Sequence, residues 1–357
     1  MTGVDESPKG KSSPRAAHSW GVIRPATEAK IGCVNVVTMG QNEDGEVRTD
    51  IINRTLNKYG VDVCGISETK WKGEGTRDIG DYVVYYSGVK ESKDAYGGVG
   101  IAVKKTLYQR APEWKAVNER LLWLRFNSAN VPTTFVACYA PTDDKSDQHK
   151  DAFYDSLEKI IEGVHERDYL VVFGDFNARV GRDSGAWCGV LGRHGLSEEV
   201  TDNGGRLLRL CAASGLCVAS TFFRHKYIHK ITHYSNNKQK TRSQIDHILV
   251  RSRWISSIGD TRVHRKAEFC GSDHRLLLAR MRLRLKAKRT QAKSQPNLDK
   301  LGDPAVQQEL ELAIKNRFML LPDELDHADI ETHWGEVKRR TLEAASEVCG
   351  VKKKRRE

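Results

Sequence analysis

Short apolar runs, interrupted by glycine, aspartate and asparagine, begin at Ile31 and continue to about residue 285. Runs of this length that are rich in β-branched and aromatic residues are typical of β-strands. They predict strands over Ile31–Val37, Val61–Ser67, Tyr82–Ser87, Val99–Val103, Leu121–Phe126, Thr134–Tyr139, Tyr169–Phe173, Leu216–Ala219, Gln244–Val250 and Leu276–Leu285.

Between some of these runs, apolar residues recur at intervals of three and four, which is the spacing of an amphipathic helix. This spacing predicts helices over Asp50–Tyr59, Asp151–Arg167 and Gly205–Ser214. Some predicted strands alternate with helices, whereas those between Tyr82 and Val103 follow one another as hairpins do. We therefore expect an α/β fold in which helices cover two mixed sheets, and not a doubly wound parallel sheet.

The two ends of the chain have a different composition. The first residues are rich in Ser, Pro and Lys and show no periodicity, which predicts a flexible leader. Lys286–Lys300 is polar and basic and predicts a linker, and helical spacing returns over Pro304–Leu321 and Ile330–Val348. The expected organisation is a leader (1–29), an α/β domain (30–285) and a basic linker with a C-terminal helical extension (286–357).

Composition favours an intracellular globular protein. Hydrophobic residues make up 39% of the 357 positions, which is enough for a buried core. No stretch approaches the ~20 apolar residues of a membrane helix, so no membrane partner is expected, and the N-terminus does not resemble a secretory signal. The eight cysteines include no CxxC pair, and Cys33, Cys64, Cys138 and Cys217 lie in apolar runs. We expect reduced core cysteines, with neither a disulfide framework nor a zinc site.

The net charge of +11 is unevenly distributed. Residues 31–223 contain 23 Lys and Arg against 27 Asp and Glu, whereas residues 224–285 contain 15 against 4. The basic region is either a solvated surface or a surface that faces a polyanion such as DNA. Candidate DNA-binding residues in it are Arg224, Lys226, Lys230 and Arg242. The cluster Lys352–Arg356 is either a nuclear-import or nucleic-acid patch, which would suit a nuclear protein, or a solvated terminus. Nothing in the sequence indicates an oligomeric state.

The strongest local feature is the apolar strand that leads into Gly174-Asp-Phe-Asn177. In extended backbone Asp175 and Asn177 would point to the same face of the strand. A carboxylate can then hold or deprotonate a water while an amide donates to a developing oxyanion. The same residues are equally typical of an Asx turn that closes a strand.

Further polar residues occur at the ends of separate predicted strands, or within them. They are Asn35, Glu68, Tyr139, Asp246, Ser272, Asp273 and His274. Each alone is typical of a structural role, but together they suit a hydrolytic site. Oxygen ligands without a Cys/His cluster favour Mg²⁺ or Mn²⁺ over zinc. No nucleotide-binding glycine loop is present, so no small-molecule cofactor is expected, and the lack of a nucleophile elbow disfavours Ser272 as a nucleophile.

These motifs, in this order, resemble the endonuclease/exonuclease/phosphatase superfamily. Within it the sequence is similar to the endonuclease domain of RTE-type LINE retrotransposons and to the craniofacial development protein 2-like proteins derived from them. The matching stretches span about residues 30–285 and are Ser67-Glu-Thr-Lys-Trp71, Tyr96-Gly-Gly-Val-Gly-Ile101, Cys138-Tyr-Ala-Pro141, Gly174-Asp-Phe-Asn-Ala178, Thr221-Phe-Phe-Arg-His-Lys226, Ser243-Gln-Ile-Asp-His-Ile248 and Ser272-Asp-His274.

The resemblance implies a four-layered α/β sandwich and a Mg²⁺-dependent phosphodiesterase, foremost a retrotransposon-derived endonuclease that nicks DNA. On the metal side it implies that Glu68 is the principal metal ligand. Asn35 would help to order Glu68, and Asp273 would add carboxylate density near the metal.

The resemblance also implies roles around the phosphate. Asp175 would position or deprotonate the attacking water, and Asn177 and Tyr139 would steady the phosphate oxygens. His274, oriented by Asp246, would contact the scissile phosphate.

The sequence departs from the family pattern at two places. The first strand usually reads Thr-Trp-Asn-Val-Arg, so Val34 and Val37 stand here in place of an aromatic residue and a cation. His233 stands where relatives carry a tryptophan near the DNA-facing loop. These departures keep one alternative open, a catalytically silent DNA- or chromatin-binding protein with this fold. Another alternative is a phosphatase or phospholipase-type member of the same superfamily.

Overall fold

The computed structural model describes residues 28–40, 48–90, 97–107, 112–127, 131–236, 239–267, 269, 271–282, 296–319 and 330–350. The chain divides into two compact units between residues 284 and 285. Most of the predicted leader, most of the predicted linker, Tyr96 and the cluster Lys352–Arg356 lie outside the described residues.

The larger sheet is built from β1 (Ala29–Asn35), β2 (Val63–Ser67), β3 (Glu74–Ile79), β4 (Tyr82–Ser87), β5 (Val99–Lys104), β14 (Ile258–His264) and β15 (Leu276–Met281). Its strand order is β14-β15-β1-β2-β5-β4-β3. β1 and β2 are parallel, and the other neighbours are antiparallel, so the sheet is mixed.

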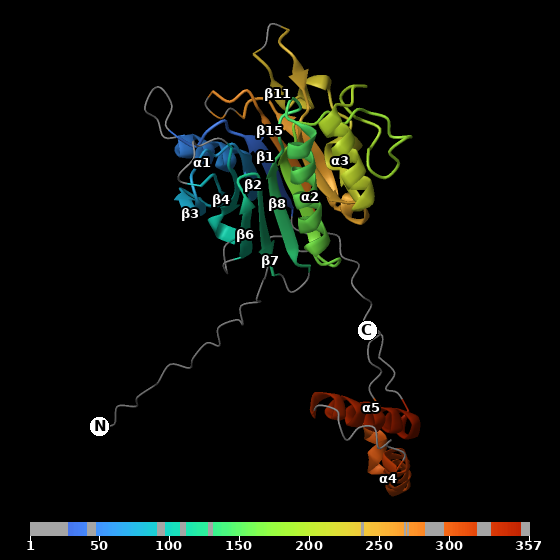
Figure 1. The fold of residues 1–357 in the computed structure, drawn as a ribbon. Coiled ribbons are helices and arrows are strands. Elements are labelled where there is room, and N and C mark those ends of the chain that lie inside the picture. Colours follow the sequence, from blue (N-terminus) through green and yellow to red (C-terminus); the bar gives the residue numbers. More distant parts are fainter. Residues whose placement is uncertain are drawn as a thin grey trace, which may run out of the picture. The chain divides into compact units, whose positions relative to one another are not determined.

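The second sheet is built from β6 (Glu113–Asn118), β7 (Leu121–Phe126), β8 (Thr133–Tyr139), β9 (Tyr169–Asp175), β10 (Leu216–Val218) and β13 (Asp246–Arg251). Its strand order is β10-β13-β9-β8-β7-β6, with β8 and β9 parallel. A small hairpin of β11 (His233–Tyr234) and β12 (Arg242–Ser243) projects from one end of the sandwich (Figure 1).

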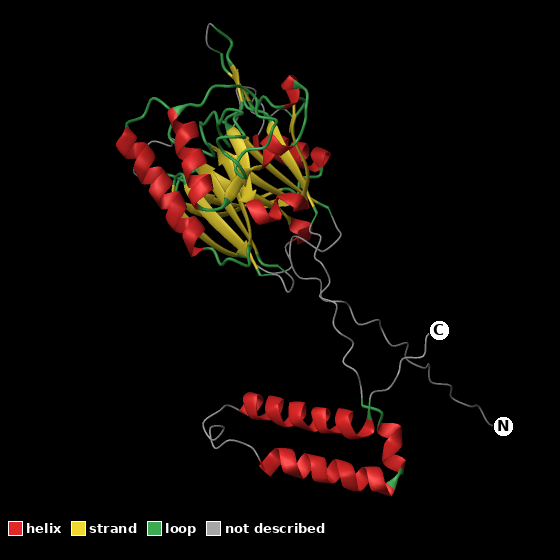
Figure 2. Ribbon diagram, turned by 90° about the vertical axis from the view of Figure 1, so that its right-hand side faces the viewer, coloured by secondary structure: helices red, strands yellow, loops and turns green. Residues whose placement is uncertain are grey.

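Helices cover the outer face of each sheet (Figures 1 and 2). They are α1 (Arg48–Tyr59) on the larger sheet, and α2 (Asp147–Gly163) and α3 (Asp202–Ala213) on the second. Short 3₁₀ helices occupy connections: η1 (Lys105–Leu107), η2 (Ala219–Phe222), η3 (Tyr227–His229) and η4 (Ser252–Ser257). Three apolar clusters follow from this order, one between the sheets and one under each helical layer.

The central strands are buried on both faces because alternate side chains enter different clusters. In β1, Cys33 packs between the sheets while Val34 packs in the cluster that contains Ile52 of α1. In β9, Phe173 lies between the sheets, and Val172 packs in the cluster that contains Leu157 of α2. The predicted four-layered α/β sandwich of two mixed sheets is confirmed.

Every strand predicted from the apolar runs is present, with bounds shifted by a few residues at some ends. The short strands β11 and β12 were not predicted, and in the two large sheets three more strands were missed, β3, β6 and β14. Each lies at the edge of a sheet, and their exposed positions carry residues such as Glu74, Glu113 and Gly259. An edge strand needs only partial burial, so it leaves no continuous apolar run in the sequence.

The second unit contains η5 (Leu298–Gly302), α4 (Pro304–Met319) and α5 (Ile330–Cys349). The two long helices lie side by side (Figure 2), and Ala344, Ala345 and Cys349 are buried in this unit. The predicted C-terminal helical extension is therefore confirmed. Within the described residues, no helix combines the length and the apolar character that crossing a membrane requires.

The cysteines that the structure describes are free thiols, and all of them except Cys188 are buried. Burial raises the pKa of Cys64 and Cys211, which keeps these thiols protonated and unreactive. The predicted core role of Cys33, Cys64, Cys138 and Cys217 is confirmed.

Candidate active site

Two pairs of parallel strands end at the same rim of the sandwich. β1 and β2 end at the register partners Asn35 and Ser67, and β8 and β9 end at the partners Tyr139 and Asp175. β13 begins at Asp246, directly opposite Asp175. Because polar side chains at the carboxyl ends of parallel strands meet at one edge, the topology gathers residues from both sheets there.

The Asn35 amide joins the two sheets at this rim. Its Nδ2 donates to Glu68 Oε1 at 2.8 Å and to Asp175 Oδ2 at 3.0 Å. Its Oδ1 accepts the backbone N–H of Val37 at 2.9 Å. That backbone donor can only be met by the carbonyl oxygen, so the orientation of the amide is set and both amide hydrogens face carboxylates.

Glu68 is held on one side and accessible on the other. Tyr139 Oη donates to Glu68 Oε1 at 3.0 Å, and Lys70 Nζ lies 3.9 Å from Oε2. The Glu68 side chain remains 21% exposed. Burial, reinforced by the Glu68 carboxylate, raises the pKa of Tyr139, so the phenol is a neutral donor. A partly exposed carboxylate with oxygen-bearing neighbours can bind a divalent cation.

The backbone is strained around these residues. Four of the five non-glycine residues with positive φ among the described residues are Val37 (62°), Glu68 (57°), Lys70 (52°) and Asn177 (48°). Left-handed backbone is uncommon for any non-glycine residue and is an outlier for a β-branched one. Such residues cost about 1–3 kcal/mol each and concentrate at functional sites. The strain therefore marks this rim as a site held in place by its surroundings.

His274 forms a buried charge network with three carboxylates. Its Nδ1 lies 2.9 Å from Asp246 Oδ2, and its Nε2 lies 3.9 Å from both Asp175 Oδ2 and Asp273 Oδ1. Burial alone would lower the pKa of His274, but the carboxylates, Asp246 foremost, raise it to about 10. Burial and the Asp246 carboxylate raise the pKa of Asp175. The carboxylates thus favour the imidazolium form of His274, which can donate from Nε2.

Asn177 lies where expected in the chain but not in the expected backbone. β9 ends at Asp175, and Asp175 Oδ1 accepts the Asn177 backbone N–H at 2.9 Å, which closes an Asx turn. The expectation that both side chains share one face of an extended strand is therefore wrong. Asn177 Nδ2 instead donates to the Ala140 carbonyl at 3.0 Å. Gly174 precedes this turn with φ of 146°, and a Cβ there would lie 2.0 Å from the Cys138 carbonyl oxygen.

Ser272 is a positioning residue. Its hydroxyl donates to the Asn35 carbonyl at 2.7 Å and accepts the His274 backbone N–H at 3.0 Å. Both contacts are buried, so the hydroxyl is engaged with backbone and is not presented as a nucleophile. It ties the loop that carries His274 to the end of β1.

Two groups of three metal-ligating side chains occur in the part of the chain that the structure describes. One is Asp175, Asp246 and His274, and the other is His233, Asp273 and His274. Glu68 belongs to neither group. Asp273 therefore lies on the histidine side of the rim, where hydrogen bonding from His233 lowers its pKa.

The four candidate DNA-binding residues have different surroundings. Arg224, Lys226 and Arg242 are exposed, and the Arg242 guanidinium lies 5.9 Å from the ring of Tyr234. Lys230 instead donates to the backbone carbonyls of the loop at 194–195, at 2.6 and 3.4 Å, and burial lowers its pKa. Its ammonium group anchors this loop.

The sequence did not reveal three residues that support the site. Lys70 lies beside Glu68. Because it follows Glu68 by two residues in the chain, its proximity to Glu68 could have been predicted from the sequence. Arg120 donates to the Tyr139 carbonyl at 3.1 Å and lies 5.1 Å from the Tyr139 ring. The buried hydroxyl of Thr232 accepts the Asp246 backbone N–H at 3.2 Å. Arg120 and Thr232 had no signal because their partners are distant in the chain.

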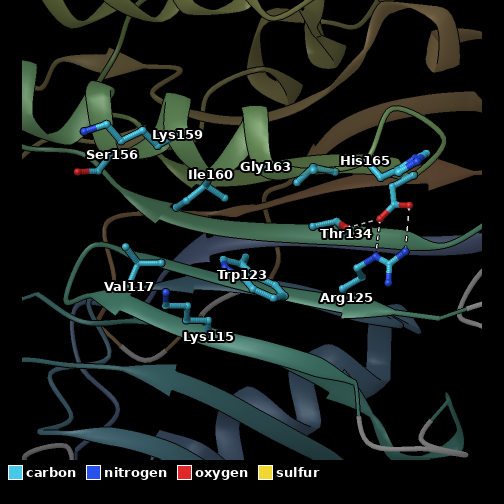
Figure 3. A pocket seen from close by; sticks show the side chains of 12 residues that line it. Lys115, Val117, Trp123, Arg125, Thr134, Ser156, Lys159, Ile160, Gly163 and His165 are labelled. Atoms are coloured by element: carbon cyan, nitrogen blue, oxygen red, sulfur yellow. Dashed lines mark hydrogen bonds and ion pairs between the residues drawn. The ribbon is translucent and has the colours of Figure 1, made fainter.

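A cavity of about 490 Å³ lies elsewhere, between α2 and the outer faces of β6, β7 and β8 (Figure 3). Thr134 and Asp168 in its wall lie at the start of β8 and β9, whereas Tyr139 and Asp175 lie at their other ends. Arg125 pairs with Asp168 there, with Nε 2.6 Å from Oδ2. The candidate active site therefore lies at the opposite end of these strands.

Comparison with known proteins shows which family the chain and its fold belong to. The model of the endonuclease/exonuclease/phosphatase family matches residues 40–274. Craniofacial development protein 2 of Tragulus javanicus is 30% identical over 312 residues, which are 80% of this chain and 53% of that protein. The Bos taurus protein of the same name is 32% identical over 256 residues, 72% of this chain and 41% of that protein. The chain spans about half the length of these curated relatives.

Solved structures show the same fold. The endonuclease domain of TRAS1, a telomere-specific non-LTR retrotransposon, superposes with a TM-score of 0.51 at 14% identity, covering 72% of this chain and all of that domain. The 3′ phosphatase NExo from Neisseria, bound to product DNA hairpin, gives 0.52 at 17% identity, covering 71% of this chain and all of that one. The family match, the shared fold and the rim of acidic, amide and histidine side chains agree: this chain belongs to the endonuclease/exonuclease/phosphatase family.

Proposed function

We propose that this chain is a phosphodiesterase that requires a divalent metal, Mg²⁺ or Mn²⁺, and that it acts as a DNA endonuclease. One observation carries the proposal. The Asn35 amide holds Glu68 and Asp175 together at one rim, beside the buried His274–Asp246 pair. The rim thus combines a candidate metal ligand, a candidate base and a cationic donor.

The donor set suits a hard cation. Glu68 offers a partly exposed carboxylate, and its neighbours Asn35 and Tyr139 are neutral. Mg²⁺ prefers oxygen ligands, keeps several waters and is commonly bound through one or two carboxylates and the phosphate of a substrate. When bound, such an ion supplies positive charge to the phosphate oxygens.

Asp175 is the residue placed to accept a proton from the attacking water. Among the described residues, its Oδ2 accepts one hydrogen bond, from Asn35, and lies 3.9 Å from His274 Nε2. Its raised pKa makes the carboxylate a stronger base than an exposed aspartate near neutral pH. The Asx turn with Asn177 fixes the direction of the carboxylate.

His274 is the residue placed to bind the phosphate. Asp246 accepts from Nδ1 and stabilises the imidazolium, so Nε2–H remains available to a phosphate oxygen. A preorganised charged donor of this kind stabilises the negative charge that spreads over the oxygens in the transition state. The Tyr139 hydroxyl is a second donor at the same rim.

Support for DNA as the substrate comes from charge and from relatives. Residues 224–285 are strongly basic, and Arg224, Lys226 and Arg242 are exposed within them. TRAS1 is described as a retrotransposon endonuclease, and the Neisseria structure contains product DNA. Exposed basic residues in this region favour a long polyanion over a small phosphate ester.

The test is nicking of supercoiled plasmid with Mg²⁺ by the wild type, Asp175→Asn and His274→Ala. Each substitution should lower the rate by about 1,000-fold, the size typical of a lost acid–base or oxyanion group. Asp168→Asn is the matched control, because it removes a buried carboxylate from the other end of the same strand. Equal nicking by wild type and both variants contradicts the proposal. DNA binding without cleavage by the wild type shows a silent binder instead.

A further inference from the structure

His233 lies against the candidate active site without a role in the proposed reaction. It is on β11, forms a β-bridge with His274, and its ring centroid lies 4.7 Å from that of His274. Its Nε2 lies 3.1 Å from Asp273 Oδ2, and its Nδ1 lies 3.3 Å from Ser243 Oγ. The ring is thus held between a hydroxyl and a carboxylate.

The two histidines are held in the same way. Each ring has Nδ1 beside an oxygen, Ser243 Oγ for His233 and Asp246 Oδ2 for His274. Each turns Nε2 toward Asp273, at 3.1 Å from Oδ2 and 3.9 Å from Oδ1 respectively. One donor atom from each of the three residues lies within 4.8 Å of the other two. Two nitrogens and one carboxylate oxygen therefore lie close enough together to contact one cation.

We infer that His233, Asp273 and His274 form a second cation site that selects zinc-class ions over Mg²⁺. Imidazole suits zinc and related transition metals, whereas Mg²⁺ prefers oxygen ligands. Three protein ligands with an open fourth position are a common zinc arrangement. Ligand histidines usually place the other ring nitrogen on a carboxylate or another polar group, as Asp246 and Ser243 do here.

The local charge favours a cation as well. Asp175, Asp246 and Asp273 surround His274, so three carboxylates outnumber the one charge of its ring. Asp246 Oδ1 is buried and has no hydrogen-bond partner among the described residues. A dication near these carboxylates would balance their excess negative charge. Forty positions separate His233 from Asp273 in the chain. The site therefore has no short spacing of metal ligands by which it could be recognised in the sequence.

Zinc bound here would release the Nε2 proton of His274 to solvent. It would therefore inhibit the enzyme, because Nε2 cannot both bind the ion and donate to a phosphate oxygen. This consequence rests on the proposed function, whereas the binding itself does not. The two are therefore tested with separate measurements.

Binding is measured by titrating the metal-stripped full chain with Zn²⁺ in competition with a chromophoric zinc chelator. The Cys188→Ser background removes the exposed thiol. The wild-type site should take one Zn²⁺ per chain, and His233→Phe should weaken this binding by at least about 100-fold while keeping a ring against His274. His225→Phe is the matched control, because His225 Nε2 also lies against a carboxylate, 2.6 Å from Asp260 Oδ1, and is similarly exposed. It should bind Zn²⁺ as the wild type does.

The inference is overturned if the wild type binds no Zn²⁺, or if His233→Phe binds it as tightly. Circular dichroism shows whether His233→Phe folds. If it does not, Ser243→Ala decides, since loss of the Nδ1 contact should weaken binding about tenfold and unchanged binding contradicts the site. In a second assay, micromolar Zn²⁺ should slow Mg²⁺-dependent nicking by the wild type more than tenfold and that by His233→Phe far less. A wild type that never nicks defeats the proposed function, while the titration still decides the cation site.

Discussion

The two halves of the rim hold charge in different ways. On the Glu68 side (Asn35, Glu68 and Tyr139) two neutral donors hold a partly exposed carboxylate, and the partly exposed Lys70 ammonium lies 3.9 Å from it. On the His274 side (Asp246, Asp273 and His274) charges of opposite sign compensate one another, and Asp246 and His274 are buried. The charge of Glu68 is therefore available to a ligand, whereas the charges around His274 also stabilise the fold. Substitutions on the two sides should separate activity from stability.

The largest expected effect is on activity at the Glu68 side. Glu68→Gln keeps the hydrogen bonds to Asn35 and Tyr139 possible but removes the charge that would hold the metal. Mg²⁺-dependent nicking should fall by about 1,000-fold or more. The free energy of unfolding should change by less than about 1 kcal/mol, because the side chain is partly solvated. Urea denaturation beside the nicking assay checks both, and a loss of several kcal/mol would remove the distinction between the two sides.

The next effect is on stability at the His274 side. Asp246→Asn leaves a buried imidazolium without its main partner, so it should lower the free energy of unfolding by about 3–5 kcal/mol. Asp260→Asn is the control, because Asp260 also pairs with a histidine, His225, but in a more exposed place. The control should cost about 1 kcal/mol or less. Equal losses in urea denaturation of the two variants would contradict the role given to burial.

A pH dependence should sharpen the comparison further. The folded pKa of His274 is raised from 6.5 to about 10. Its contribution to stability is therefore complete below pH 6.5 and is lost as the pH rises toward 10, by up to about 1.4 kcal/mol per pH unit. Urea denaturation of the metal-free wild type and of His274→Gln between pH 7 and 10 measures this contribution to the free energy of unfolding. The wild type should lose stability faster than the variant; parallel curves would show that the charge network does not raise the pKa.

The smallest expected effect concerns DNA contact beyond the rim. Arg242 is exposed, whereas Lys230 is engaged with backbone carbonyls. Affinity falls as salt concentration rises, and Arg242→Ala should make the slope of log affinity against log salt concentration shallower by about 1. Lys230→Ala should leave this slope unchanged. DNA-binding titrations at several salt concentrations distinguish the two. A shallower slope for Lys230→Ala and an unchanged slope for Arg242→Ala would indicate that DNA contacts the loop that Lys230 anchors.

The central part of the fold could be predicted from the sequence because its strands are buried on both faces. Such strands consist of continuous apolar runs in the sequence. The observed bounds of β4 and β7 are therefore the same as the predicted ones. The edge strands β3, β6 and β14 could not be predicted, because half-exposed positions tolerate polar residues. The order of the elements also predicted two mixed sheets covered by helices, and the family resemblance implied their four-layered arrangement.

The candidate site could be predicted as a set of residues but not as a geometry. Asn35, Glu68, Tyr139 and Asp175 were identified at strand ends, and the structure brings them into direct hydrogen-bond contact. Asn177 has left-handed backbone and closes an Asx turn. From the sequence, an extended strand and an Asx turn were equally good interpretations of these residues. Contacts made by residues far apart in the chain left no local pattern, as at His233 and Asp273.

The amide of Asn35 has one more consequence, which concerns alignment. It belongs to one sheet and binds Asp175 of the other. The Ser67 hydroxyl, which donates to the Cys138 carbonyl, also joins the layers, and apolar packing around residues such as Phe173 fills the space between them. A shift of one sheet against the other by about 1 Å would break the hydrogen bond between Asn35 and Asp175. A misplacement of catalytic groups by that distance can lower the rate by about 100-fold. The cleavage rate would then act as a gauge of how the sheets are aligned. A substitution at the fully buried Phe173 should therefore lower the cleavage rate as well as the melting temperature.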